Sequence, residues 1–350
     1  MSEESNREYG WLIEDWLPIG HRVMDTSTEG SFKTMTGCYI SVCVAAGERF
    51  LGKNVRQGPV LIVDEETPEP DLKNHLQRFA QGFGCASWEG LPITVKSMEG
   101  FKFDRKTELA KLLKWVNDTK PLFIRIDSVL ACLPGGRQGM GENNAETGIA
   151  IRDDLNIILQ EMPECSILLS AHSRKFAAEL GLKQLKQYEM QSLVRGHGSI
   201  VGEACDTGLI IKKISEHPKP TRFVILTKAR RRAVPMTAKD VYVELEEEDY
   251  GKGLARLKEI APQVIPPSKI ASNLYMMFND GEFVNASTIV KKAAFYTKKE
   301  NQMGIEELLE RKVIVPAIGE PFSYKLNPKL QTQVDKDYLA VLDESMKSES

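Results

Sequence analysis

The residues with the clearest potential for chemistry are Lys33 and Thr34, which follow the loop TSTEGSF between a predicted strand and a predicted helix. This setting is typical of the phosphate-binding loop GxxxxGK[ST], whose backbone N–H groups hold phosphates, whose lysine reaches their oxygens and whose hydroxyl binds Mg²⁺. Ser27 and Phe32 depart from the pattern, because each stands where that loop has glycine. On these residues alone, a nucleotide loop and a strand–turn–helix with a solvated lysine remain equally open. The residues predicted to contact a nucleotide are Ser27, Thr28, Glu29, Gly30, Ser31, Phe32, Lys33 and Thr34.

Three apolar strands predicted further along the chain lead into polar residues. LFIRID ends at Asp127 in the Walker B arrangement, where a carboxylate supports Mg²⁺ through water; the alternative is an aspartate that caps the next segment. PVLIVD is followed by Glu65 and Glu66, either of which could activate water, although acidic residues also favour first turns of helices. CSILLSAH ends at His172, which could sense a bound γ-phosphate, whereas a lone histidine is more often structural.

These polar residues need a fold that brings strand ends together. Short apolar runs alternate with longer helical ones, which predicts βαβ units and an α/β fold with a mainly parallel sheet flanked by helices. Ligands of such sheets bind at the carboxyl ends of the strands, so the polar residues are expected at one edge. The predicted strands are 21–26, 59–64, 122–127 and 165–170, and the predicted helices are 33–46, 69–82, 107–118 and 149–162.

The pattern changes after residue 205. Residues 207–215, 221–227 and 241–245 predict antiparallel strands that extend the sheet, and the acidic run 244–249 with PQVIPP at 262–267 predicts a boundary. Beyond it, helical runs at 269–278, 287–293 and 302–311 precede short strands at 313–315 and 323–326, which is the winged-helix order. The predicted organisation is a flexible N-terminus (1–10), a main α/β domain (11–250), a linker (251–267), a winged-helix-like domain (268–330) and a polar tail (331–350).

Composition narrows the class of protein. The 350 residues include 46 Lys+Arg and 49 Asp+Glu, for a net charge of −3, which excludes coating of nucleic acid by bulk positive charge. No apolar run approaches the ~18 residues that cross a bilayer, and the polar start MSEESNREYG lacks the apolar core of a secretory signal. The six cysteines form no CxxC pair, so neither a disulfide framework nor a zinc site is expected. We expect a cytoplasmic protein with no membrane partner.

In this order and spacing, the motifs resemble those of the RecA-like P-loop ATPases, in particular the RepA-type hexameric replicative helicases. The core is also similar to DnaB-type helicases. WLIEDWLPIGHRVMDTSTEGSFKTMTG looks like the lead-in and phosphate loop of that family, IDSVLACLPG like its Walker B segment, and SAHSRK like its histidine sensor. VRGHGSIVGEACDTGLII resembles its Arg-Gly-x-Ser loop, and LTKARRRAVP its K-x-R strand. The resemblance covers residues 11–245.

The resemblance implies a RecA fold with ATP and Mg²⁺ as cofactors, hydrolysis at the subunit interfaces of a hexameric ring, and single-stranded DNA in the channel. Carried over by position, Glu66 or Glu65 activates water, Thr34 and Asp127 hold Mg²⁺, and His172 senses the γ-phosphate.

Two further sets of residues follow from the same resemblance. Lys228 and Arg230 would act on the nucleotide of the neighbouring subunit, while the alternative for this cationic cluster is a solvated strand end. The residues expected to contact DNA in the channel are Arg195, Gly198 and Ser199.

The predicted function is that of an ATP-dependent DNA helicase or DNA-dependent ATPase of replication or recombination. The altered glycines favour two alternatives: a nucleotide-dependent DNA-binding regulator with slow or no hydrolysis, and a structural relic of the loop. Retention of the lysine, the carboxylates and the histidine favours the first. The C-terminal unit could bind duplex DNA or a protein partner through the lysines near its predicted recognition helix, Lys291, Lys292, Lys298 and Lys299.

Overall fold

The computed structural model divides the chain into two compact units, Met1–Leu180 with Leu185–Ile260, and Ala261–Ser350 with Gly181–Gln184. The residues that the structure describes are 10–27, 32–103, 106–133, 145–175, 177, 182–194, 204–215, 220–229, 240–249, 252–260, 269–278, 284–285, 287–289, 297–310, 313–317 and 322–327.

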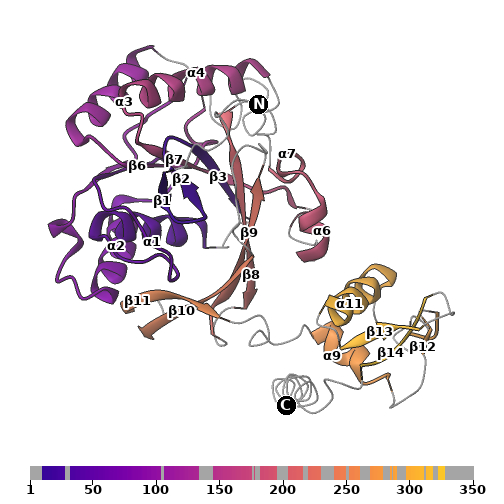
Figure 1. Ribbon diagram of the computed structural model, residues 1–350. Coiled ribbons are helices and arrows are strands. Elements are labelled where there is room, and N and C mark those ends of the chain that lie inside the picture. The colour runs from indigo at the N-terminus through magenta and orange to yellow at the C-terminus, as the bar shows by residue number, and fades with distance from the viewer. Residues whose placement is uncertain are drawn as a thin grey trace, which may run out of the picture. The chain divides into compact units, whose positions relative to one another are not determined.

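A nine-stranded sheet forms the centre of the first unit (Figure 1). Its order is β11-β10-β9-β8-β3-β7-β6-β4-β5, in which the strands from β8 to β5 are parallel and β8 to β11 pair antiparallel. The strand that precedes the phosphate loop is β3, and the Walker B strand β6 is separated from it by β7. This confirms the RecA-like α/β fold with antiparallel strands late in the domain. The strands are β3 (Arg22–Ser27), β4 (Val60–Asp64), β5 (Ile93–Ser97), β6 (Phe123–Asp127), β7 (Ser166–His172), β8 (Thr207–Ser215), β9 (Arg222–Ala229), β10 (Val241–Asp249) and β11 (Lys252–Ile260), with a separate hairpin of β1 (Trp11–Ile13) and β2 (Leu17–Pro18).

Helices cover both faces of the sheet. α1 (Lys33–Ala46) contacts β3, β4 and β6 and is covered by α2 (Glu69–Gly82), whereas α3 (Lys106–Thr119) and α4 (Ala145–Glu161) pack together on the other face (Figure 1). Because α1 lies between the sheet and α2, nearly its whole surface is buried, and its sequence is correspondingly apolar. It ends at Gly47, whose φ of 74° places it in the left-handed region that glycine adopts readily. Two short helices follow β7, α6 (Leu182–Gln187) and α7 (Met190–Leu193), and a 3₁₀ turn, η2 (Trp88–Gly90), precedes β5.

The predicted linker is wrong in its first part. Residues 252–260 form β11, which pairs with β10, and the acidic run 244–249 lies within β10. The side chains of Ala255 and Leu257 are buried against α2, while the charged residues between them face outward, so the strand has a buried face despite its charge. Gly82, at the end of α2, lies so close to this strand that a Cβ there would be 2.1 Å from the Ala255 carbonyl oxygen.

The second unit has a hydrophobic core of its own. It contains α9 (Lys269–Tyr275), α11 (Lys298–Glu310) and a three-stranded sheet ordered β12-β14-β13, from β12 (Val284–Asn285), β13 (Ile314–Pro316) and β14 (Ser323–Leu326). Of the helix expected at 287–293, only 287–289 are described, and they are helical. The winged-helix assignment stays a prediction. Lys291 and Lys292 lie outside the described residues.

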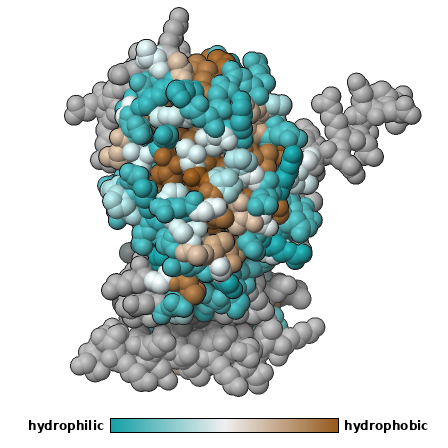
Figure 2. Space-filling view, turned by 90° about the vertical axis from the view of Figure 1, so that its left-hand side faces the viewer, coloured by the Kyte–Doolittle hydropathy of each residue, from teal (hydrophilic) through white to brown (hydrophobic). Residues whose placement is uncertain are grey.

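The surface drawn in colour in Figure 2 is mostly hydrophilic, with hydrophobic patches between the polar side chains. Among the described residues, no helix is both long enough and apolar enough to cross a membrane.

Candidate functional site

The carboxyl ends of β3, β4, β6 and β7 bring five predicted residues to one edge of the sheet. Asp127 is the last residue of β6 and His172 the last of β7, Glu66 lies just beyond β4, and Lys33 and Thr34 open α1. The unpaired backbone N–H groups at the start of a long helix favour anions, so α1 supplies a phosphate-binding end beside these side chains. The expected convergence of the five residues is therefore present.

A chain of contacts links the lysine, the histidine and the glutamate. Lys33 Nζ lies 3.1 Å from His172 Nδ1, and His172 Nε2 lies 2.9 Å from Oε1 and 3.2 Å from Oε2 of Glu66. An ammonium group can only donate, so Nδ1 must accept. The imidazole proton is thereby assigned to Nε2, where it is donated to the Glu66 carboxylate.

Glu66 and Glu65 have different surroundings. The hydrogen bond from His172 is the main reason why the pKa of Glu66 falls to about 2, with further help from Ser128 and Lys33. Glu66 therefore stays ionised, as a residue that orients water must. Glu65 turns away: its two carboxylate oxygens accept hydrogen bonds from the backbone N–H groups of Gly100 (2.9 Å) and Phe101 (3.1 Å). Of the two glutamates, the geometry supports Glu66 as the residue that activates water.

Thr34 and Asp127 lie close enough to share a cation. The Thr34 hydroxyl donates to Asp127 Oδ2 at 3.0 Å, and Asp127 is buried with only 2 % of its surface exposed. Hydroxyl and carboxylate oxygens are the donors that Mg²⁺ prefers, and it is commonly held by one or two carboxylates together with substrate phosphates. No three His, Cys, Asp or Glu side chains of the described residues are grouped to hold a metal by themselves. The residues therefore fit a Mg²⁺ whose other ligands come from a nucleotide.

Three buried charged residues beneath this edge were not predicted. Asp64 and Arg125 are fully buried, and Asp25 is 1 % exposed. Burial raises the pKa of Asp25 to about 7, and the Asp127 carboxylate adds to the rise. Neither Asp25 oxygen has a hydrogen-bond partner of good geometry among the described residues. Burial also raises the pKa of Asp64 to about 6, against the opposing effect of Arg125. Each lies inside an apolar strand, where the only signal is the charge itself.

Phe32 keeps the backbone of the glycine that it replaces. Its φ of 63° is in the left-handed region, and its carbonyl oxygen accepts a hydrogen bond from the Thr36 N–H at 2.8 Å, which begins α1. The ring stacks on Phe223 of β9, with centroids 5.5 Å apart and planes inclined by 24°. Because Phe223 is fully buried, this contact directs the Phe32 ring toward the core of the domain.

The other predicted site residues are placed only in part. Ser27 ends β3 and is buried, whereas Thr28, Glu29, Gly30, Ser31, Arg195, Gly198, Ser199 and Arg230 lie outside the described residues. Lys228 is near the end of β9, where its ammonium group donates to the backbone carbonyl of Lys186 in α6 of the same chain. Partial burial lowers its pKa.

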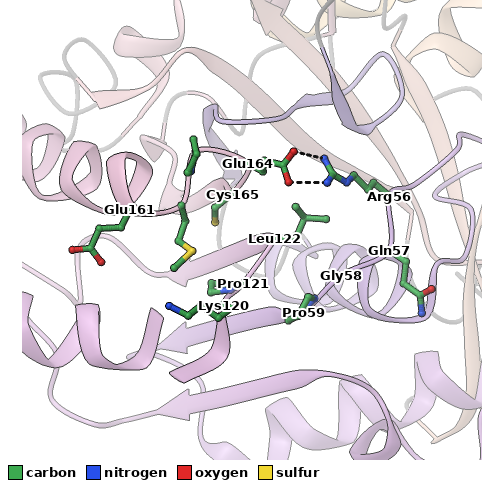
Figure 3. Close-up of a pocket in the computed structure, with 12 residues that line it drawn as sticks. Arg56, Gln57, Gly58, Pro59, Lys120, Pro121, Leu122, Glu161, Glu164 and Cys165 are labelled. Atoms are coloured by element: carbon green, nitrogen blue, oxygen red, sulfur yellow. Dashed lines mark hydrogen bonds and ion pairs between the residues drawn. The ribbon is translucent and has the colours of Figure 1, made fainter. Parts of the chain in front are cut away.

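A cavity of about 430 Å³ lies at the opposite edge of the sheet (Figure 3). Its lining includes Pro59, Leu122 and Cys165, which immediately precede the strands β4, β6 and β7. Arg56 and Glu164 form an ion pair of 2.7 Å on one side of it (Figure 3). Because the cavity lies at the amino ends of these parallel strands, it is not part of the site formed by Lys33 and Asp127.

Residues 2–178 match the model of a protein family described as the AAA domain, a match that spans more than half of the chain. The chain belongs to this family. As an AAA-domain protein it is a nucleotide-binding P-loop ATPase, and the residues gathered at the carboxyl edge form its candidate nucleotide site.

Solved structures similar to this AAA-domain protein include a KaiC-like protein from the hyperthermophilic archaeon Pyrococcus horikoshii OT3, at 18% identity and a TM-score of 0.43, covering 71% of this chain and 94% of that one. Another is a separately solved ATPase domain, at 12% identity and a TM-score of 0.46, covering 67% of this chain and 84% of that one. No curated protein sequence matches the chain.

Proposed function

We propose that this AAA-domain protein hydrolyses Mg-ATP and uses the reaction to act on DNA, as a helicase or DNA-dependent ATPase of replication or recombination. The observation that carries the proposal is the contact chain from Lys33 through His172 to Glu66, next to the Thr34–Asp127 pair. A phosphate-binding lysine, a water-activating carboxylate and two Mg²⁺-binding oxygens are the groups that phosphoryl transfer requires.

In this proposal each residue has one task. Lys33 and the N-terminus of α1 bind the β- and γ-phosphates, and Thr34 and Asp127 hold Mg²⁺, which neutralises charge on the phosphate oxygens. Glu66 orients the attacking water and accepts its proton, for which its low pKa keeps it ionised. The departing phosphate is then released from the same edge of the sheet.

His172 is proposed to report the presence of the γ-phosphate. Lys33 cannot donate the same proton to His172 Nδ1 and to a phosphate oxygen, so nucleotide binding competes with their 3.1 Å contact. Loss of this contact frees the imidazole to turn and so to loosen its hold on Glu66. The state of the phosphate would thus reach the water-activating glutamate through one side chain.

The proposal extends to a hexameric ring of identical subunits, in which two further segments take part. Lys228 and Arg230 alternate on one strand and would face the same neighbouring nucleotide, for which Lys228 must leave the Lys186 carbonyl. Arg195, Gly198 and Ser199 would contact single-stranded DNA in the channel, and the C-terminal unit would bind duplex DNA or a protein. All six cysteines are free, which fits the reducing cytoplasm that we propose as its location.

A second candidate function is a nucleotide-dependent switch with slow hydrolysis. The observation in its favour is the Glu66–His172 contact, which holds the glutamate away from free water. The two candidates differ in whether DNA releases this restraint.

The test is the rate of ATP hydrolysis by the full chain with and without single-stranded DNA, using Arg195→Ala as the matched variant. The motor proposal predicts a rate that rises at least ~10-fold with DNA and a variant that loses the rise while keeping its basal rate. Slow hydrolysis that DNA leaves unchanged would contradict the motor and support the switch. For the ring, mixtures of Lys33→Ala and Arg230→Ala chains should recover activity that neither has alone.

A further inference from the structure

Arg125 is a charged residue buried completely inside the ATPase domain, beneath the candidate nucleotide site. It lies on β6 two residues before Asp127, so both side chains project from the same face, toward α1. One guanidinium nitrogen lies 3.2 Å from Asp64 Oδ2, and the other donates to Asp127 Oδ2. The guanidinium therefore bridges the last carboxylates of two neighbouring strands, which are paired in register.

Gly37 provides the space for this guanidinium. A Cβ built at Gly37 would lie 2.2 Å from Arg125 Nε and 2.7 Å from its Cδ, so no side chain fits there without displacing the arginine. A glycine in the interior of a helix costs about 1 kcal/mol relative to alanine. The helix that begins with Lys33 and Thr34 thus accepts an unfavourable residue where Arg125 passes beneath it.

The contacts of Asp127 show what the arginine does there. Thr34 and Arg125 both donate to Oδ2, which fixes the carboxylate from two directions. We propose that Arg125 is a positioning residue: it holds the Asp127 carboxylate so that Oδ1 faces the site where Mg²⁺ and its water ligands bind. This inference rests on the proposed nucleotide site but not on hydrolysis, DNA or a ring.

A purely structural ion pair is the competing explanation, and the chain contains one for comparison. Arg78 on α2 is also buried, at 5 % exposed, and pairs with Glu247 of β10 far from Lys33. Buried ion pairs often stabilise a protein no more than apolar residues of similar size. A structural role therefore predicts that disturbing either arginine lowers stability alone, whereas positioning predicts that only Arg125 affects the metal.

The experiment measures the affinity of the full chain for Mn²⁺ in the presence of a non-hydrolysable ATP analogue, from the electron paramagnetic resonance signal of free Mn²⁺. Binding of the analogue without metal is measured in parallel by its displacement of a fluorescent nucleotide. The variants are Arg125→Lys, which keeps the charge but loses the two-pronged geometry, and Gly37→Ala, which keeps every charge but displaces the guanidinium. The controls are Arg78→Lys and Gly82→Ala, since a Cβ at Gly82 clashes comparably with β11.

We expect Mn²⁺ to bind 10- to 100-fold more weakly in both site variants, roughly the effect of disturbing a group that orients a metal ligand. Metal-free binding of the analogue and both controls should stay within about twofold of wild type by the same comparison. Gly37→Ala keeps the proposal testable if Arg125→Lys does not fold. Unchanged Mn²⁺ affinity in Gly37→Ala, or an equal loss in the controls, would overturn the positioning role. Wild-type chain that binds no analogue at all would instead overturn the proposed nucleotide site.

Discussion

Glu66 and Glu65 are adjacent in sequence, yet only Glu66 reaches the histidine that contacts the phosphate-binding lysine. Glu66→Gln keeps the size and polarity of the side chain but cannot accept a proton from water. We predict that this variant hydrolyses ATP ~10²- to 10⁴-fold more slowly, the usual contribution of a general base, while it binds ATP with unchanged affinity. Phosphate release and equilibrium binding of a fluorescent nucleotide would measure the two effects separately.

Glu65→Gln is the matched control for that variant. Its side chain holds the backbone at Gly100 and Phe101, so the substitution should lower the unfolding temperature and leave the rate of hydrolysis within a few-fold of wild type. A loss of hydrolysis in Glu65→Gln with full activity in Glu66→Gln would reverse the assignment.

Asp25 should make folding stability depend on pH. Its pKa is about 7 in the folded chain, raised by burial from the ordinary value of 3.8. Between these values the folded chain retains a proton that the unfolded chain has lost, so the free energy of unfolding decreases as the pH rises through this window. Each unit of pKa difference corresponds to about 1.4 kcal/mol.

We therefore predict that Asp25→Asn, which cannot ionise, is more stable than wild type at pH 8 and similar to it at pH 4. Urea unfolding of the nucleotide-free chain at the two pH values provides the measurement. A wild type and variant with parallel pH profiles would show that Asp25 ionises freely in the folded chain.

Among the elements, α1 begins in an unusual way, because Phe32 holds the left-handed conformation that phosphate loops give to glycine. Phe32→Ala would keep the backbone strain and lose the stacking on Phe223, while Phe32→Gly would lose the stacking and relieve the strain. We predict that the alanine variant is less stable than the glycine variant by about 1–2 kcal/mol, the cost of the left-handed conformation. Chemical denaturation gives the order, and an alanine variant as stable as the glycine variant would contradict the strain.

The helices were predicted more accurately than the strands. The bounds of α1 and α2 are those expected at 33–46 and 69–82, because apolar spacing and the glycine after α1 mark them clearly. β11 was missed because its buried residues, Ala255 and Leu257, alternate with charges in a sequence that looks like a solvated linker. β5, half-buried along its length at the edge of the sheet, carries a similarly weak signal.

The candidate site shows the same division. Lys33, Thr34 and Asp127 were predictable because their motifs are local in sequence. The separation of Glu66 from Glu65 depends on contacts with residues far along the chain, so the sequence left both open. Arg125 was not predicted, since a charge inside an apolar strand does not reveal its partners. Only the pairing of β4 with β6 and the approach of Gly37 give it a role.

At the scale of the whole molecule, the position of β11 determines where the ATPase domain ends. β11 pairs with β10, receives the Tyr39 hydroxyl at the Leu257 carbonyl (3.2 Å), and accepts a hydrogen bond from Arg78 at the Gly253 carbonyl (3.2 Å). A chain of residues 1–260 should therefore fold and bind nucleotide without the second unit. A chain of residues 1–250 should unfold more than about 5 °C lower, because the apolar surface of α2 is uncovered. Equal melting temperatures by circular dichroism would place the boundary at residue 250.

The central claim is that the carboxyl edge of the sheet hydrolyses ATP through Lys33. Its most direct test is phosphate release from ATP by the purified full chain in Mg²⁺, compared with Lys33→Ala. Removing one group that stabilises transition-state charge commonly lowers a rate by ~10²- to 10³-fold, and we predict at least the lower figure together with weakened ATP binding. A wild-type chain that releases phosphate no faster than Lys33→Ala would contradict the account.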